Sequence, residues 1–239
     1  MIYLSVVLVA FLAGIVQGVT GFGGGVIMMM ILPLYFAIPQ GAGITVSMGI
    51  VLCGMMVIRY RKDIKVKMAI TPSILYLVVC SIVINFATMV NQEVMKKIFG
   101  VFLILLAVYY LFLTKSVSKR KLGAAASVVC IVISAACDGL FGIGGPLMVL
   151  YFMNMTDSTY EYLGTLQLFF MVNSIYNTVF RFYKGILCPE HLIYVGVGLF
   201  GILSGVFLAN KIVDRLNVNV IRKLTYVMIG VSGVLNLIG

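Results

Sequence analysis

Long apolar runs separated by short charged segments dominate the chain. The first charged side chain is Arg59, and uncharged runs also cover 68–92, 98–114, 122–137, 139–156, 162–180, 192–210 and 224–239. Several of these runs approach the roughly 20 apolar residues that a helix needs to cross a bilayer core of about 30 Å. The pattern predicts an all-α, multi-pass integral membrane protein of the cell membrane.

Two of the runs are broken by glycine. The opening run, 2–36, would be about 52 Å long as one helix at 1.5 Å per residue, and glycines at 18, 21, 23, 24 and 25 interrupt it. Its arms, 2–17 and 25–36, are both shorter than the bilayer core, which favours a re-entrant hairpin of two half-helices. The stretch 122–153 repeats this arrangement. Two short crossings in place of each hairpin are the alternative.

The two broken runs belong to an internal repeat. Residues 17–24 align with 138–145 at an offset of 121, and Thr45, Ser47 and Arg61 align with Thr165, Gln167 and Arg181 at an offset of 120. We therefore expect one membrane domain, 1–239, made of a first repeat, 1–116, and a second, 122–239, joined by the basic segment 115–121. Each hairpin would precede three full spans, at 41–58, 69–90 and 97–114 and then at 163–182, 191–209 and 219–238.

Charge predicts how the repeats are oriented. If each hairpin returns the chain to its starting side, each repeat crosses three times and the two repeats are inverted. The side of the 59–67 loop then holds all but four of the 17 lysines and arginines, the exceptions being Lys96, Lys97, Arg181 and Lys184. A single crossing by each broken run gives a less uneven distribution. The positive-inside rule thus favours inverted repeats with the 59–67 loop inside and both termini outside.

Composition narrows the classes of function. The chain is 62% hydrophobic and 10% charged, its polar connections are short, and it has no phosphate-loop motif. We therefore expect no soluble domain and no phosphate-binding loop for ATP-driven transport. Basic loops that face anionic lipid explain the net charge of +10, so we expect no nucleic-acid partner. The five cysteines lack C-x-x-C spacing, and His191 has only Cys188 nearby, so we expect no metal or cofactor. The sequence is compatible with either a monomer or a homo-oligomer.

The glycine breaks are the candidate substrate site. Unwound backbone survives inside a membrane where it is buried in protein or lines a cavity. Half-helices that begin near Gly25 and Pro146 would aim N–H groups and positive dipole ends at a small anion. The alternative is that the glycines serve helix packing, as in Gly14-x-x-x-Gly18. The expected ligands are Gln17, Thr20, Gly23, Gly24, Gly142, Gly144 and Gly145, supported by Thr45, Gln167 and Asn173. For the last three residues, hydrogen bonds between helices are the alternative.

Asp138 occupies the repeat position of Gln17 and is the one carboxylate well inside an apolar run. A medium of low polarity favours its protonated form, so Asp138 is the candidate proton-coupling group. A protonated, purely structural aspartate is the alternative. Arg61 and Arg181 end equivalent spans, where we expect both side chains to extend towards the interface.

The two motifs resemble a known family. Gly14-x-x-x-Gly18-x-x-Gly21-Phe22-Gly23-Gly24-Gly25 and Asp138-Gly139-Leu140-Phe141-Gly142-Ile143-Gly144-Gly145-Pro146 are similar to the paired motifs of the TauE/SafE-like sulfite exporters, and the resemblance covers the whole chain. It implies a permease for small sulfur-containing anions such as sulfite or an organosulfonate.

Two positions depart from that family. Pro146 stands where glycine often continues, and it suits the first turn of a helix. Asp138 stands where a small neutral residue is usual, and as a carboxylate it would repel a bound anion. We expect a secondary transporter that works by alternating access, with proton coupling open. A passive anion channel is the alternative. An intramembrane enzyme is disfavoured because the apolar runs contain no paired acids, Ser–His pair or metal cluster.

Overall fold

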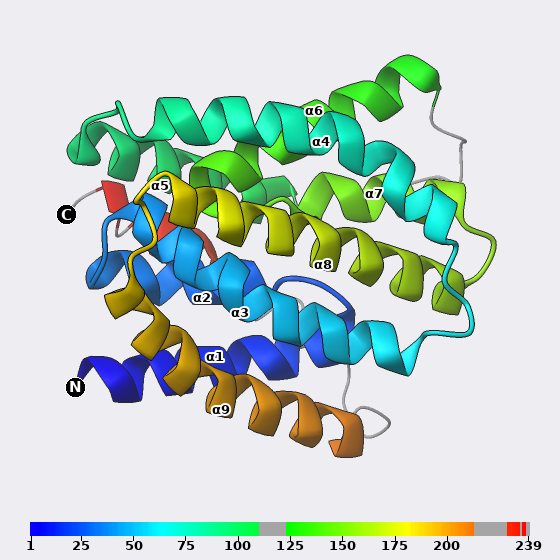
Figure 1. Ribbon diagram of the computed structural model, residues 1–239, viewed down its shortest axis with the longest axis horizontal. Coiled ribbons are helices and arrows are strands. Elements are labelled where there is room, and N and C mark those ends of the chain that lie inside the picture. Colours follow the sequence, from blue (N-terminus) through cyan, green and yellow to red (C-terminus); the bar gives the residue numbers. More distant parts are fainter. Residues whose placement is uncertain (110–122, 213–228, 235, 238–239) are drawn as a thin grey trace.

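The computed structural model describes residues 1–109, 123–212, 229–234 and 236–237, and this part of the chain is helical without a strand (Figure 1). The elements of the first half are α1 (Ile2–Thr20), α2 (Gly24–Ile31), η1 (Leu32–Leu34), α3 (Ile38–Arg59), α4 (Val66–Ala87) and α5 (Gln92–Val108). Those of the second half are α6 (Ala124–Phe141), α7 (Gly145–Met155), α8 (Thr159–Tyr183) and α9 (Pro189–Ile212). The expected all-α architecture is confirmed.

Within the described residues, α1, α3, α4, α6 and α9 are long and apolar enough to cross a membrane. The expected spans 41–58, 69–90 and 191–209 correspond to α3, α4 and α9, and 163–182 lies in α8. The expected span 97–114 is described only as far as α5 reaches. The basic segment 115–121 and residues 219–228, 235 and 238 of the expected last span, 219–238, lie outside the described residues.

The first glycine break turns the chain back on itself. Gly21 and Gly23 have φ angles of 82° and 95°, a left-handed conformation that side chains with a Cβ rarely adopt. Helix α2 then returns along α1. The evidence is that the hydroxyl oxygen of Ser5, near the start of α1, lies 3.0 Å from the hydroxyl oxygen of Tyr35. The geometry is that of a hairpin.

Helix α1 is longer than the half-helix expected from the glycines. It continues through Gly18 to Thr20 and reaches 19 residues, or about 28 Å at 1.5 Å per residue. Gly18 stays helical because it packs on α9, where a methyl group added at Gly18 would lie 2.8 Å from Cβ of Ala209. Gly14 also packs on α9, so these two glycines serve packing while those from Gly21 onwards form the break.

The second break repeats this plan. Helix α6 ends at Phe141 and is capped by Gly142, whose φ is 66°, and α7 starts at Gly145. With 18 residues, α6 also exceeds the expected half-helix. In Figure 1, α1 begins at the left end of the bundle and α6 at the right end, and both breaks lie within the bundle.

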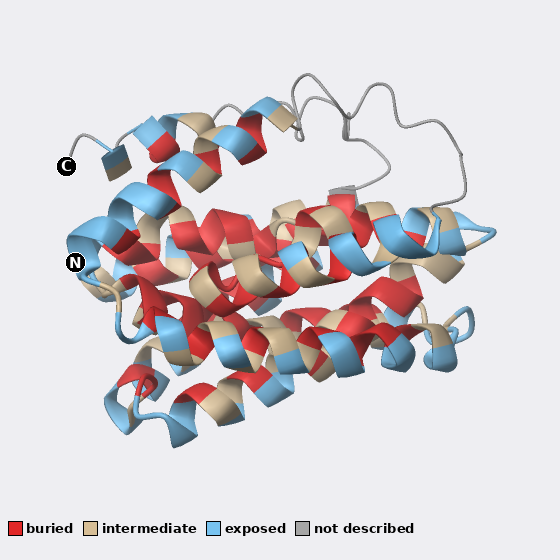
Figure 2. Ribbon diagram, turned by 90° about the horizontal axis from the view of Figure 1, so that it is seen from above, coloured by how far each residue is buried: buried red, intermediate tan, exposed pale blue. Residues whose placement is uncertain are grey.

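The helices pack in matching pairs. Helix α1 packs on α9, and α6 packs on α4, the helix that the expected repeat aligns with α9. Helices α3 and α8, which the expected repeat aligns with each other, pack together, and α3 also contacts α9 while α8 contacts α4. Buried residues concentrate along this central contact (Figure 2). The core therefore lies where the two breaks and the central helix pair meet.

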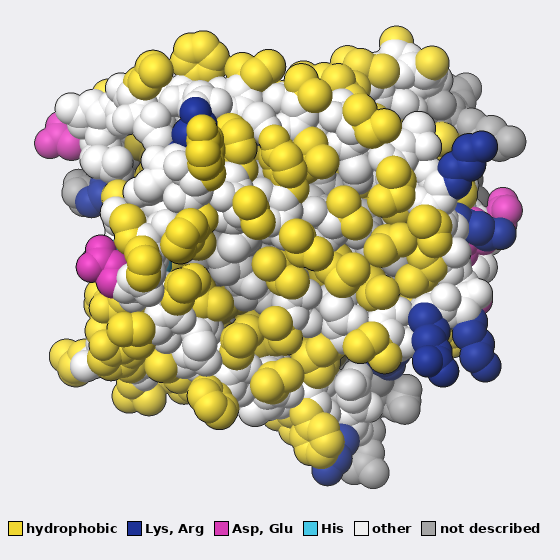
Figure 3. Space-filling model, viewed as in Figure 1, with side chains coloured by type: hydrophobic (Ala, Val, Ile, Leu, Met, Phe, Trp, Pro, Cys, Tyr) yellow, Lys and Arg dark blue, Asp and Glu magenta, His cyan; other side chains and the backbone are white. Residues whose placement is uncertain are grey.

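The outer face is apolar, and its charges lie at the ends. Leu4, Leu8 and Leu12, which are 64%, 54% and 46% exposed, form one stripe along α1. Figure 3 shows apolar side chains over the middle of the molecule and most lysines and arginines at one end. That end carries Arg59, Arg61, Lys62, Lys65, Lys67 and Lys211, and the opposite end carries Lys96, Lys97 and Lys184. This is the surface of an integral membrane protein.

Candidate functional site

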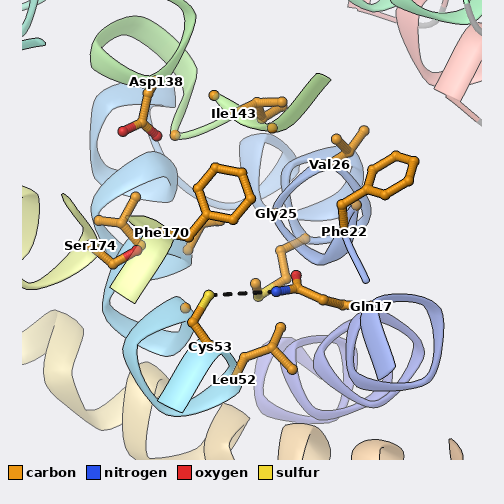
Figure 4. A pocket seen from close by; sticks show the side chains of 18 residues that line it. Gln17, Phe22, Gly25, Val26, Leu52, Cys53, Asp138, Ile143, Phe170 and Ser174 are labelled. Carbon is orange, nitrogen blue, oxygen red and sulfur yellow. Dashed lines mark hydrogen bonds between the residues drawn. The ribbon is translucent and has the colours of Figure 1, made fainter. Parts of the chain in front are cut away.

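A cavity lies between the two glycine breaks (Figure 4). Its empty space is about 520 Å³, including the part that opens to the exterior. Both breaks, the starts of α2 and α7, and the middle of α3 and α8 supply its wall. Of the residues expected at the site, the cavity is lined by Gln17, Gly23, Thr45, Asp138, Gly142, Gly144 and Gly145.

Two side-chain amides hold the first break. The Gln17 carbonyl oxygen accepts the N–H of Gly24 at 3.1 Å, so it caps the N-terminus of α2. The Gln17 amide nitrogen donates to the Gln167 side-chain oxygen at 3.1 Å. The Gln167 amide nitrogen donates in turn to the main-chain oxygen of Gly21. Gln167 therefore fixes the break from α8 and does not line the cavity.

Thr20 also belongs to the frame of the break. Its hydroxyl lies 2.8 Å from the carbonyl oxygen of Val16 and 2.7 Å from that of Phe22. Because the hydroxyl is occupied by main-chain acceptors, Thr20 joins the end of α1 to the turn. Like Gly24 and Gln167, it is a residue of the expected set that lies behind the cavity wall.

Thr45 has a buried hydroxyl without a protein partner. The side chain is 2% exposed, and its Oγ1 makes no hydrogen bond within the described structure. A threonine inside a helix ordinarily bonds to the carbonyl four residues earlier, as Ser47 on the same helix does at 2.8 Å. A lone hydroxyl in a cavity wall costs free energy unless a ligand or water that enters the cavity satisfies it.

The helix starts supply further hydrogen-bond donors. Gly25 and Gly145 line the cavity within the first turns of α2 and α7. The first four N–H groups of a helix have no acceptor inside the helix, and its N-terminus carries a partial positive charge. The two helix starts therefore make the cavity favourable for a small anion.

Sequence reasoning did not assign the wall residues Gly25, Cys53 and Ser174 to the site. Gly25 belongs to the glycine run already singled out. Cys53 lies 120 residues before Asn173, so the repeat offset could have found it. Nothing in the sequence marks Ser174. Asn173 itself lies elsewhere, where it donates to the Ser73 hydroxyl at 3.1 Å and to the Phe169 carbonyl at 2.7 Å.

Asp138 meets the cavity from the second break. The carboxylate is 8% exposed and lines the cavity. Its Oδ2 accepts the Asn177 amide at 2.6 Å, and the Cys80 thiol lies 3.8 Å from the same oxygen. The Ser134 hydroxyl bonds to the carbonyl of Gly144, which ties the far side of the break to α6. Polar side chains of α4, α6 and α8 thus hold this end of the cavity.

Arg181 is fully buried, contrary to the expectation that it reaches the interface. Its guanidinium donates to the carbonyls of Asp138 and Gly139 at 3.1 and 2.7 Å and to that of Pro39 at 3.2 Å. Asp138 and Gly139 lie in the last turn of α6, whose C-terminal end carries a partial negative charge, and Pro39 lies in the first turn of α3. The equivalent Arg61 is exposed, as expected.

One group of residues has the composition of a metal site. Ligand atoms of Cys188, Glu190 and His191 lie within 4.8 Å of one another. However, Nδ1 of His191 accepts the main-chain N–H of Cys188 at 2.9 Å. In a neutral imidazole Nε2 then carries the proton, so neither nitrogen has a free lone pair for a metal.

In this arrangement, two broken helices meet at a polar cavity, and side chains and helix starts supply the hydrogen bonds that water would otherwise make. Membrane transport proteins have this architecture. Comparison with protein families agrees. The family model described as Sulfite exporter TauE/SafE matches residues 6–235, so the chain belongs to this family of membrane transporters.

One curated relative supports the same class. The chain is 32% identical over 167 residues to a protein of Methanocaldococcus jannaschii named probable membrane transporter protein. That alignment covers 62% of this chain and 60% of the relative, so the chain spans less than two thirds of the relative's length. No solved structure matches the chain.

Proposed function

We propose that the protein is a secondary transporter for a small sulfur-containing anion, such as sulfite or an organosulfonate, and that the anion binds in the cavity between the two breaks. The family supports the choice of a sulfur anion. The observation that carries the binding site is the buried Thr45 hydroxyl, which has no hydrogen-bond partner among the described residues and lines the cavity with the starts of α2 and α7. An oxyanion would accept hydrogen bonds from all three.

The transporter works by alternating access between two inverted repeats, 1–116 and 122–239. The matching helix pairs support this, since the contacts α1–α9, α1–α2, α2–α3 and α3–α9 have counterparts in α6–α4, α6–α7, α7–α8 and α8–α4. The opposite starting ends of α1 and α6 support the inversion (Figure 1). If each repeat adopted the conformation that the other repeat now has, the cavity would open to the opposite side of the membrane.

The end that carries the 59–67 loop lies in the cytoplasm. Six of the described lysines and arginines gather there, against three exposed ones at the opposite end, and positive charge favours the cytoplasmic side. The N-terminus then lies outside. Asp138 is the proton-coupling group in this scheme, because it is the buried carboxylate of the cavity wall.

A passive anion channel could use the same cavity, and an exchange assay separates the two functions. Purified protein in proteoliposomes is loaded with unlabelled sulfite or methanesulfonate, and uptake of the labelled anion is followed. A transporter that alternates gives saturable uptake that internal substrate accelerates. Uptake that rises linearly with concentration and ignores internal substrate would identify a channel.

A further inference from the structure

Asp138 and Arg181 carry the two opposite charges that the described part of the protein buries. Among the described residues, Asp138 is the one buried carboxylate, and Arg181 is the one buried side chain with a permanent positive charge. The guanidinium lies beside Asp138, because it donates to that residue's own carbonyl at 3.1 Å. Its three acceptors are neutral carbonyls, and its Nε is buried without a partner. Within the described residues, no carboxylate therefore pairs directly with this cation.

Apart from Arg181, the groups that titrate near the Asp138 carboxylate are thiols and a phenol, which are neutral in their ordinary forms. Facing it are Tyr76 and Cys80 of α4, Cys53 of α3, Cys137 of α6 and Arg181 of α8. Thiols and phenols are uncharged near neutral pH, and an arginine stays charged. The net charge beside the cavity therefore depends on Asp138, Arg181 and whatever anion enters.

We propose that Arg181 is the fixed cation that sets the coupling ratio of this permease to one proton for each monovalent anion. The inference rests on the proposed function. In the empty site the charges of ionised Asp138 and Arg181 cancel. An anion adds one negative charge, and a buried charge without compensation is costly. A proton on Asp138 restores neutrality, so proton and anion cross together and the cycle moves no net charge.

Counting charge and protons per anion tests this ratio. Methanesulfonate is the anion of a strong acid and keeps one negative charge throughout, so a proton that accompanies it is carried by the protein. Uptake, intravesicular pH and current are followed in the same proteoliposomes, with equal pH on both sides. The expected wild-type result is one proton per methanesulfonate without current. If only sulfite is transported, the count is made with sulfite, which we expect as the monoanion with one proton.

Two substitutions shift the balance in different directions. In Asp138→Asn the cation alone balances the anion, so we expect flux to continue without protons and to become electrogenic. In Arg181→Gln the loaded site keeps an uncompensated negative charge, so we expect uptake to fall at least tenfold. Arg181→Lys keeps the charge and should restore electroneutral uptake in part. Arg61→Gln, at the exposed equivalent position, is the matched control and should leave both flux and charge per anion unchanged.

The outcomes separate the two proposals. Anion uptake that carries one negative charge equally in wild type and Asp138→Asn would overturn the role of Arg181 and leave the permease standing. Because Arg181→Gln could fail to fold, the charge count in wild type and Asp138→Asn decides the question without it. If no sulfur anion moves through the wild-type protein, the proposed function fails, and this inference fails with it.

Discussion

The substitution Gln17→Met tests whether the first break is held by side-chain amides. Gln17 is 5% exposed, and its side chain bonds to Gly24 and Gln167 at 3.1 Å each. Methionine fills a similar volume but leaves the Gly24 N–H and the Gln167 oxygen unsatisfied. Each buried polar group without a partner costs about 1–3 kcal/mol, so the loss is about 2–6 kcal/mol. For a chain of this size that lowers the melting temperature by roughly 4–24 °C.

The measurement is thermal unfolding of the purified protein in detergent, together with anion uptake in proteoliposomes. Uptake should fall as well, because α2 loses its cap and the cavity wall loses Gln17. Gln40→Met is the control. Gln40 accepts the N–H of Ala37 at 3.3 Å in a half-buried position, where water can replace it. A Gln17→Met protein with the melting temperature and uptake of the wild type would refute the assigned role.

Two further predictions separate binding from packing. Thr45→Val should leave stability unchanged or raise it, since the lost hydroxyl had no partner among the described residues. Uptake should fall roughly 10- to 100-fold, because that hydroxyl donates to the charged ligand. A loss of stability as large as the loss of uptake would contradict this role. Gly201→Ala should lower the melting temperature, because the added methyl group would lie 2.9 Å from the Phe11 nitrogen on α1 and overpacking costs about 1–3 kcal/mol. Gly196→Ala on the same helix meets nothing within 4 Å and should not destabilise the protein; similar melting temperatures for the two variants would rule out close α1–α9 packing.

Patterns along the chain predicted the helical class and the positions of the breaks. The break positions are readable because glycine alone tolerates the left-handed φ found at Gly21, Gly23 and Gly142. The ends of the helices were less predictable. Gly18 remains helical because Ala209 packs against it. These two residues are far apart in the sequence, so no local sequence pattern predicts their contact.

The same limit applies to the site. Gln17 and Asp138 were readable as unusual polar residues in apolar runs. Their partners were harder to identify, because Gln167 and Asn177 lie on α8, 150 and 39 positions away in the sequence. Arg181 was misjudged for a related reason. The aligned Arg61 is exposed, and the burial of Arg181 depends on main-chain carbonyls of α6 and α3, which lie far from it in the sequence.

The central claim is that an intramembrane site couples the movement of a small sulfur anion to a proton through Asp138. Its most direct test is uptake of sulfite and methanesulfonate into proteoliposomes with and without an imposed proton gradient, for wild type and Asp138→Asn in parallel. We expect the gradient to drive accumulation above equilibrium in wild type, and we expect Asp138→Asn to lose that accumulation. Flux that only equilibrates, equally in both proteins, would contradict proton-coupled transport and return Asp138 to a structural role.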